Sequence, residues 1–165
     1  MKLALEVVNS LERDGIIGRY ALGGAMAAVF YAEPVSTFDV DIFIAFSASP
    51  SGLISLAPIY EALARKGFVE SGDYVEIGGV PVQFLATYNT LVEESLEKAV
   101  DILYDGVITR VFGLEYLIAI AMQTGRPKDR GRVEMLLSQA KPDMALLEEI
   151  VQRYGLKGIW KKWTS

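Results

Sequence analysis

STFDVDIFIAF, residues 36–46, combines an apolar, β-branched run with two aspartates, Asp39 and Asp41, two positions apart. Residues at this spacing in a strand point to the same face, so the two carboxylates project together while Val40 and Ile42 face the core. Carboxylates are rarely buried without a partner, because their desolvation is costly. The stretch therefore predicts a strand with a core face and an acidic face. The acidic face would be either a solvated sheet edge or a site for a divalent metal ion, for which oxygen ligands suit Mg²⁺.

The composition narrows the chemistry available to the chain. It has 165 residues, 52% of them apolar, which predicts a single domain over 1–165. It contains no cysteine and no histidine, which excludes thiol nucleophiles, Ser-His-Asp triads and the usual His/Cys zinc sites. Catalysis would therefore depend on carboxylates, hydroxyls, Lys, Arg or a bound metal ion.

Charge and hydropathy indicate the expected environment. No apolar run reaches the roughly 20 residues that a membrane span needs, and the N-terminal stretch MKLALEVVNSLERDG acquires acidic residues too early for a signal peptide. We therefore expect a cytoplasmic protein with no membrane contact. The net charge of −5 provides no global attraction for nucleic acid, and no DNA partner is expected.

Hydrophobic spacing divides the chain into a sheet core over about 16–111 and a helical part over about 113–163. Helices are predicted for 2–14, 25–32, 58–66, 90–99, 114–124, 128–140 and 143–154, strands for 19–22 and 38–46, and hairpins for 73–85 and 100–111. The hairpins argue against a doubly wound parallel sheet. The predicted fold class is α/β of the α+β kind: a mixed, mainly antiparallel sheet flanked by helices, with a helical C-terminal third.

A Gly-Gly pair, Gly23 and Gly24, lies upstream of the aspartates, between a short strand and a short helix. Glycines let a backbone approach a phosphate, and a helix N-terminus attracts anions. The alternative is a tight turn in which small residues serve packing. A phosphate site beside paired metal ligands would suit phosphoryl or nucleotidyl transfer, because metal ions neutralise the charge on triphosphate oxygens.

Two segments carry a resemblance to a known family. GGAMAAVFYAEPVSTFDVDIFI, 23–44, resembles the signature of the nucleotidyltransferase superfamily with the DNA polymerase beta-like fold, in which a Gly-Gly or Gly-Ser turn precedes a strand with two metal-binding acids. GLEYLIAIAMQTGRPKDRGRVEMLL, 113–137, is similar to a helix–loop–helix of the small bacterial AbiEii-toxin-like and MNT-type nucleotidyltransferases. Within the superfamily, the chain is most similar to these two groups.

The resemblance implies the nucleotidyltransferase fold, an NTP as substrate and Mg²⁺ as cofactor. Asp39 and Asp41 would bind the metal ion, Gly23 and Gly24 would hold phosphate, and Thr37 would cap the turn or contact phosphate. The reaction would transfer a nucleoside monophosphate to an acceptor, with release of pyrophosphate. The acceptor stays open among RNA, protein and a small molecule, and a protein partner or antitoxin is also implied.

The chain departs from the family at a third carboxylate on a neighbouring strand. In VPVQFL, 80–85, the matching residue is Gln83, whose neutral amide can coordinate a metal ion but cannot accept a proton at neutral pH. If Gly78 and Gly79 form the hairpin turn, Glu76 is a diagonal neighbour of Gln83 and would be a substitute. The alternative is a solvent-facing Glu76.

A basic loop precedes one of the predicted C-terminal helices. In TGRPKDR, 124–130, cations stand where a helix begins, which is electrostatically unfavourable for the helix. We therefore predict that Arg126, Lys128 and Arg130 contact a triphosphate or the acceptor, with ion pairs to neighbouring acids as the alternative. Related proteins often have an acidic residue near Arg132, so the match here is partial.

Two functional hypotheses follow. The first is a Mg²⁺-dependent nucleotidyltransferase in which Gln83, with Glu76, completes the site of Asp39 and Asp41. The second is a catalytically degenerate module that binds a nucleotide or a partner without turnover, because the third carboxylate is missing.

Overall fold

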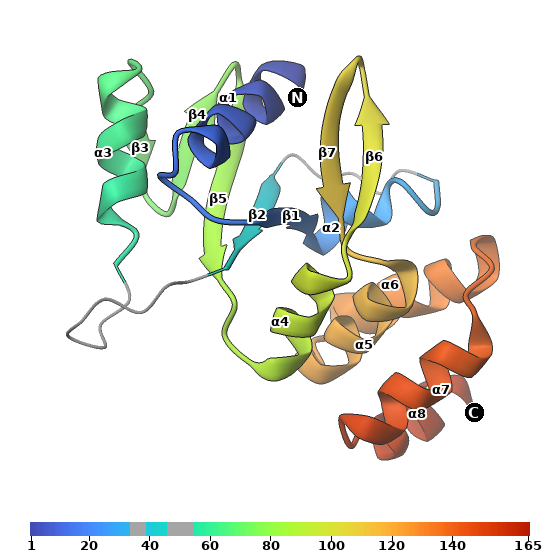
Figure 1. The fold of residues 1–165 in the computed structure, drawn as a ribbon. Helices are drawn as coiled ribbons and strands as arrows, with labels where there is room; N and C mark the ends of the chain where they lie inside the picture. Colours follow the sequence, from blue (N-terminus) through green and yellow to red (C-terminus); the bar gives the residue numbers. More distant parts are fainter. Residues whose placement is uncertain (34–38, 46–54) are drawn as a thin grey trace.

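The computed structural model describes residues 1–33, 39–45 and 55–165, which form one mixed sheet with helices packed around it (Figure 1). The helices are α1 (Lys2–Arg13), α2 (Gly24–Ala28), α3 (Ala57–Arg65), α4 (Thr90–Glu97), α5 (Leu114–Thr124), α6 (Pro127–Gln139), α7 (Met144–Arg153) and α8 (Lys157–Thr164). The strands are β1 (Tyr20–Gly23), β2 (Val40–Ile44), β3 (Glu70–Ser71), β4 (Tyr74–Ile77), β5 (Val80–Ala86), β6 (Val100–Tyr104) and β7 (Val107–Val111).

The sheet has seven strands in the order β3-β4-β5-β2-β1-β7-β6. Its hairpins β3–β4, β4–β5 and β6–β7 and the central pair β1–β2 are antiparallel, whereas β2–β5 and β1–β7 are parallel. The predicted fold class, a mixed and mainly antiparallel sheet flanked by helices, is confirmed. Both predicted hairpins form, and the Gly78-Gly79 turn pairs Ile77 with Val80, as the sequence indicated.

Local signals set most of the helix boundaries. Asn89 caps α4 by accepting a hydrogen bond from the backbone N–H of Val92 at 2.9 Å, and Gly125 ends α5 in the left-handed conformation. The predicted helix over 25–32 is shorter than expected, since α2 ends at Ala28. After Ala28 the chain continues in tighter turns, in which the N–H groups of Phe30 and Tyr31 donate to the carbonyls three residues back.

The C-terminal helices lie together beyond one end of the central strands (Figure 1). α5 is the most buried of them and contacts α2, α4, α6 and α7. The C-terminal tail also packs against the domain, because Trp163 of α8 is buried. Within the described part of the chain, none of the helices has both the length and the apolar character to cross a membrane.

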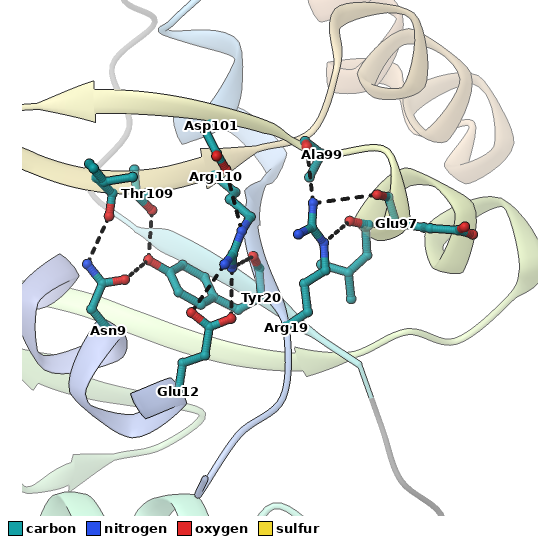
Figure 2. A network of polar contacts seen from close by, with 11 residues as sticks. Asn9, Glu12, Arg19, Tyr20, Glu97, Ala99, Asp101, Thr109 and Arg110 are labelled. Carbon is teal, nitrogen blue, oxygen red and sulfur yellow. Dashed lines mark hydrogen bonds and ion pairs between the residues drawn. The ribbon is translucent and has the colours of Figure 1, made fainter. Parts of the chain in front are cut away.

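A polar network joins α1 to β1 and β7 (Figure 2). Tyr20 donates its hydroxyl hydrogen bond to Asn9, and the hydroxyls of Tyr20 and Thr109 lie 2.9 Å apart. The guanidinium of Arg110 pairs with Glu12 at 2.8 Å. Each of these side chains has its partner within the network. The effect of the network is therefore to hold α1 on the sheet.

Candidate functional site

Three neighbouring strands place Gly23, Asp41 and Gln83 in one row across the sheet. Gly23 of β1 is paired with Asp41 of β2, and Asp41 is paired in turn with Gln83 of β5. Residues at the same level of adjacent strands point to the same face. The position predicted for a third carboxylate is therefore next to Asp41, and it holds an amide.

The two glycines have different reasons to be glycine. A Cβ on Gly23 would overlap the rings of Phe43 and Phe112, so this position serves packing. Gly24 has φ +60, and a Cβ there would overlap the carboxylate of Asp41. Only Gly24 lines the cavity described next, and its lack of a side chain lets the start of α2 lie against Asp41.

Asp39 and Asp41 both line a cavity of about 590 Å³ between the sheet and α6. Asp39 comes directly before β2, and the hydroxyl of Tyr74 donates to its Oδ2 at 3.5 Å. Burial raises the pKa of the Asp41 carboxyl, and the neighbouring Asp39 raises it further. The charge of Asp41 is therefore incompletely compensated by the protein.

Cationic side chains of α6 form the opposite wall of this cavity. Arg126 stands at the N-cap of the helix, and Lys128 and Arg132 follow on the side that faces the aspartates. The same three side chains partly offset the raised pKa of Asp41, with Arg132 having the largest effect. The cavity thus has one acidic wall and one basic wall.

A buried carboxylate holds two of these arginines. The side chain of Asp129 is 1% exposed and accepts from Nε of Arg126 at 2.6 Å and from Nη1 of Arg132 at 3.4 Å. It also accepts from the backbone N–H of Arg126, which completes a capping box at the start of α6. The ion pairs that the sequence offered as an alternative to ligand binding therefore form, and they do so within the cavity wall.

The structure brings together many but not all of the predicted site residues. Gly24, Asp39, Asp41, Gln83, Arg126 and Lys128 line the same cavity. Arg130 does not line it, because its side chain turns to Glu134 at 3.0 Å. Glu76 is exposed, is paired with Pro81 and lies outside the cavity wall. Thr37 lies outside the described residues.

Two polar side chains of the cavity wall, Tyr74 and Arg132, were not among the predicted site residues. Arg132 shares a helical face with Lys128 and Met135, a spacing of three to four residues that the sequence shows once α6 is assigned. Tyr74 lies on the strand next to Gln83, and the alternation of β4 buries Val75 and Ile77 on the other face. The hairpin register could have predicted Tyr74, whereas its contact with Asp39 requires the folded sheet.

A second cavity of about 290 Å³ shares Asp41, Gln83 and Arg132 with the first. Its other walls are mainly apolar and come from the sheet, from α5 and from Tyr88, which is 60% exposed. The charged cavity therefore continues into a second cavity whose remaining walls are mainly apolar.

The donor atoms near Asp41 suit a weakly held divalent ion. The described residues include no cluster of three or more His, Cys, Asp or Glu side chains able to hold a metal ion. The oxygen donors available are the two carboxylates and the amide of Gln83. Mg²⁺ is usually held by one or two carboxylates, with waters and substrate phosphates completing its octahedron. Two carboxylates and one amide oxygen therefore fit Mg²⁺.

Comparison with known proteins shows similarity in fold but not in sequence. No protein-family model and no curated protein matches this sequence. A nucleotidyltransferase-like antigenic protein from Paracoccidioides brasiliensis has a similar structure, with a TM-score of 0.57 and 15% identity over 96% of this chain and 90% of that one.

Two structures of the antibiotic-resistance factor ANT(2'')-Ia are also similar. A complex with adenylyl-2''-tobramycin gives a TM-score of 0.50 at 13% identity, covering 92% of this chain and 98% of that one. A solution structure gives a TM-score of 0.52 at 13% identity, covering 98% and 91%. At this identity the likeness establishes the fold, which is the nucleotidyltransferase fold that the sequence predicted.

Proposed function

We propose that this chain is a Mg²⁺-dependent nucleotidyltransferase that binds an NTP in the cavity between β2 and α6. The observation that supports this most directly is that Asp39 and Asp41 line the same cavity as the basic side chains of α6. Gly24 lies beside them, and its lack of a side chain leaves room next to Asp41. A nucleotide with its metal ion has the matching arrangement, a cation next to several phosphate oxygens.

The residues divide the work of such a reaction between them. Asp39 and Asp41 would hold Mg²⁺, which when bound neutralises charge on the phosphate oxygens and orients them. Arg126, Lys128 and Arg132 would contact the triphosphate, and the backbone of Gly24 lies close enough to Asp41 to bring phosphate next to the metal ligands. Pyrophosphate would leave as the nucleoside monophosphate passes to the acceptor.

The position next to Asp41 holds no carboxylate that could remove a proton from the acceptor. Gln83 occupies that position and cannot accept a proton. The protonated form of Asp41 is favoured relative to an ordinary aspartate in the ligand-free protein, and a bound cation would reverse this shift. Asp39 and Asp41 are the carboxylates that line this cavity, and we propose that one of this pair takes the acceptor's proton.

The position of Gln83 also favours a second candidate function, a module that binds a nucleotide without turnover. The two candidates differ in one measurement: the first releases pyrophosphate, and the second does not. The same proposal includes membership of the AbiEii-like or MNT-type subgroup and a protein partner or antitoxin. It also includes a cytoplasmic location and a single domain over 1–165.

The acceptor is proposed only as a class of nucleophile: a hydroxyl or similar group on RNA, on a protein or on a small molecule. One structural neighbour was solved in complex with adenylyl-2''-tobramycin. The acidic surface of this chain makes a cationic small molecule or a protein a better match than RNA.

The test is a thermal-shift titration of the chain with each NTP, with and without Mg²⁺, followed by assay of pyrophosphate release with candidate acceptors. A ligand that binds only the folded state must raise its apparent stability. We expect a Mg²⁺-dependent rise with at least one NTP and none with the nucleoside. If no NTP at millimolar concentration gives a metal-dependent shift, both candidate functions are wrong.

A further inference from the structure

Asp129 makes more contacts than a helix cap requires. A capping box needs one carboxylate contact to the N-cap backbone, and Asp129 provides this to Arg126 at 3.3 Å. Its Oδ2 also accepts from Nε of Arg126 at 2.6 Å, and its Oδ1 accepts from Nη2 of Arg126 at 3.2 Å and from Nη1 of Arg132 at 3.4 Å. One buried carboxylate therefore orients two guanidinium groups.

These contacts leave part of each guanidinium available to a ligand. A guanidinium has five N–H donors in a planar fork, and within the described residues Asp129 is the only acceptor found for the side chains of Arg126 and Arg132. Both side chains line the cavity that contains Asp39 and Asp41. The remaining donors lie on a wall from which a bound anion can be reached.

Arg130 provides an internal comparison on the same helix. It pairs with Glu134 at 3.0 Å, and the two side chains are 48% and 56% exposed, which makes this an ordinary surface ion pair of small energetic effect. The Asp129 carboxylate is 1% exposed, and the desolvation of a buried carboxylate is costly even when it is paired. Asp129 is the buried member of this cluster, since Arg126 is 53% and Arg132 17% exposed. The desolvation cost of Asp129 therefore invites an explanation besides stabilisation.

We infer that Asp129 is a positioning residue that holds Arg126 and Arg132 as a fixed pair, and that this pair binds the two terminal phosphates of the nucleotide. The inference rests on the proposed function, because its ligand is the pyrophosphate part of the NTP. Two guanidiniums aligned by one carboxylate match a ligand with two adjacent phosphates, since each can form forked hydrogen bonds with one of them.

The experiment is a calorimetric titration of the full-length chain with inorganic pyrophosphate and with AMP, each in the presence of Mg²⁺. Arg132→Ala is compared with Arg130→Ala, which removes the same charge from the same helix outside the cavity wall. We expect Arg132→Ala to weaken pyrophosphate binding at least about tenfold, the loss typical of a hydrogen bond to a charged group. Arg130→Ala should change it less than about twofold, because an exposed ion pair contributes little. AMP binding should change little in either variant.

Asp129→Asn separates positioning from net charge. The substitution makes the cavity more positive, so charge alone predicts tighter pyrophosphate binding, whereas loss of the tether predicts weaker binding. We expect weaker binding. If Asp129→Asn does not melt cooperatively, Arg132→Lys takes its place: it keeps the charge but cannot bind Asp129 and phosphate with one planar fork, and we expect the same loss.

Three results would overturn the inference. In the first, Asp129→Asn, or Arg132→Lys in its place, binds pyrophosphate as tightly as the wild type or more tightly. In the second, Arg132→Ala and Arg130→Ala have equal effects on pyrophosphate binding. In the third, the wild-type chain does not bind pyrophosphate. Pyrophosphate release from NTPs is measured separately. If the chain releases pyrophosphate and Arg132 has no effect on pyrophosphate binding, only the proposed subsite is wrong. If pyrophosphate binding depends on Arg132 but no pyrophosphate is released from any NTP, only the transferase proposal is wrong.

Discussion

Glu94 and Asp41 lie in two different parts of the molecule, and the pKa values of their carboxyls are shifted in opposite directions. Glu94 of α4 accepts hydrogen bonds from Arg153 and Tyr154 of the α7 region and from Tyr116 of α5. These contacts, with Arg153 the largest contributor, lower the pKa of Glu94 to about 2. Burial and Asp39 raise the pKa of Asp41.

The difference separates a structural charge from one that is available to a ligand. Around Glu94 the protein supplies the compensating cation and the hydrogen-bond donors, and the ionised form joins three helices. Around Asp41 the charged group with the largest influence is a second carboxylate, Asp39, and the cations line the same cavity. The first arrangement is complete in the ligand-free protein, whereas the second would be completed by a metal ion and phosphate.

Asp41→Asn should have the largest effect, and the effect should be opposite in sign on activity and on stability. Pyrophosphate release should fall at least about a hundredfold, because loss of a direct ligand should exceed the 10–100-fold cost of losing an outer contact. Since ionised Asp41 is disfavoured in the folded state, its neutral replacement should raise the melting temperature of the ligand-free chain. Initial rates and melting curves of the same preparation test both parts.

A melting temperature that falls in Asp41→Asn would break the comparison, because Asp41 would then be a structural charge like Glu94. Asn at position 41 is nearly isosteric with Asp, so the measurement isolates the charge.

Gln83→Asp should sharpen the comparison by placing a third carboxylate next to Asp41. If the missing proton acceptor limits the reaction, turnover should increase roughly a hundredfold, the lower end of what a general base contributes. The ligand-free chain should become less stable, because a third negative charge joins the pair. Rates at saturating NTP, with Gln83→Asn as the control that adds no charge, test this expectation.

An unchanged rate in Gln83→Asp, together with NTP binding, would support the module without turnover. A fall in rate in both Gln83→Asp and Gln83→Asn would show that the length of the glutamine side chain itself has a role.

Glu94→Gln should act on stability and leave nucleotide binding unchanged. The substitution removes the charge that pairs with Arg153 while keeping the shape of the side chain. We expect the free energy of unfolding to fall by about 1 kcal/mol, less than for a fully buried charge-assisted hydrogen bond, because Arg153 is 42% exposed. Urea unfolding measures the loss, and the Mg²⁺-dependent thermal shift with NTP should retain its wild-type size.

Acid should produce a smaller, graded form of the same effect. Because the folded-state pKa of Glu94 lies below its ordinary value of 4.5, its contribution is complete above about pH 4.5. It is lost as the pH falls from there toward 2. The stability difference between the wild type and Glu94→Gln should therefore shrink over this range. Urea midpoints at pH 7, 4.5 and 3 test it, and a constant difference would contradict the assigned pKa.

Much of the fold followed from local patterns. The hairpin turn at Gly78-Gly79, the cap at Asn89 and the stop at Gly125 depend on the conformations of single residues and their immediate neighbours, so the sequence predicts them. β3 was not predicted, because two residues carry no periodicity. The boundary of α2 was also missed, since hydrophobic spacing does not distinguish an α-helix from the tighter turns that follow Ala28.

The candidate site was predictable where its residues lie close in the chain. Strand alternation is enough to place Asp39 and Asp41 together, and the Gly-Gly pair upstream is visible in the sequence. The roles of the two glycines were not distinguishable, because the rings that Gly23 meets and the carboxylate that Gly24 meets come from other strands. The sequence also could not show which of Arg130 and Arg132 lines the cavity, since the orientation of each side chain depends on the carboxylate with which it pairs.

The sequence by itself determined which reactive groups the chain has: it contains no His or Cys and carries paired aspartates after a Gly-Gly turn, from which we predict metal-assisted phosphoryl or nucleotidyl transfer. The tertiary structure decided which charges belong to the cavity. It placed Gln83 beside Asp41 through the register of β2 and β5, turned Arg130 outward to Glu134, and buried Asp129 between Arg126 and Arg132. The physical reason is that the energy of a charge depends on its solvent exposure and on its neighbours in space, and folding decides both.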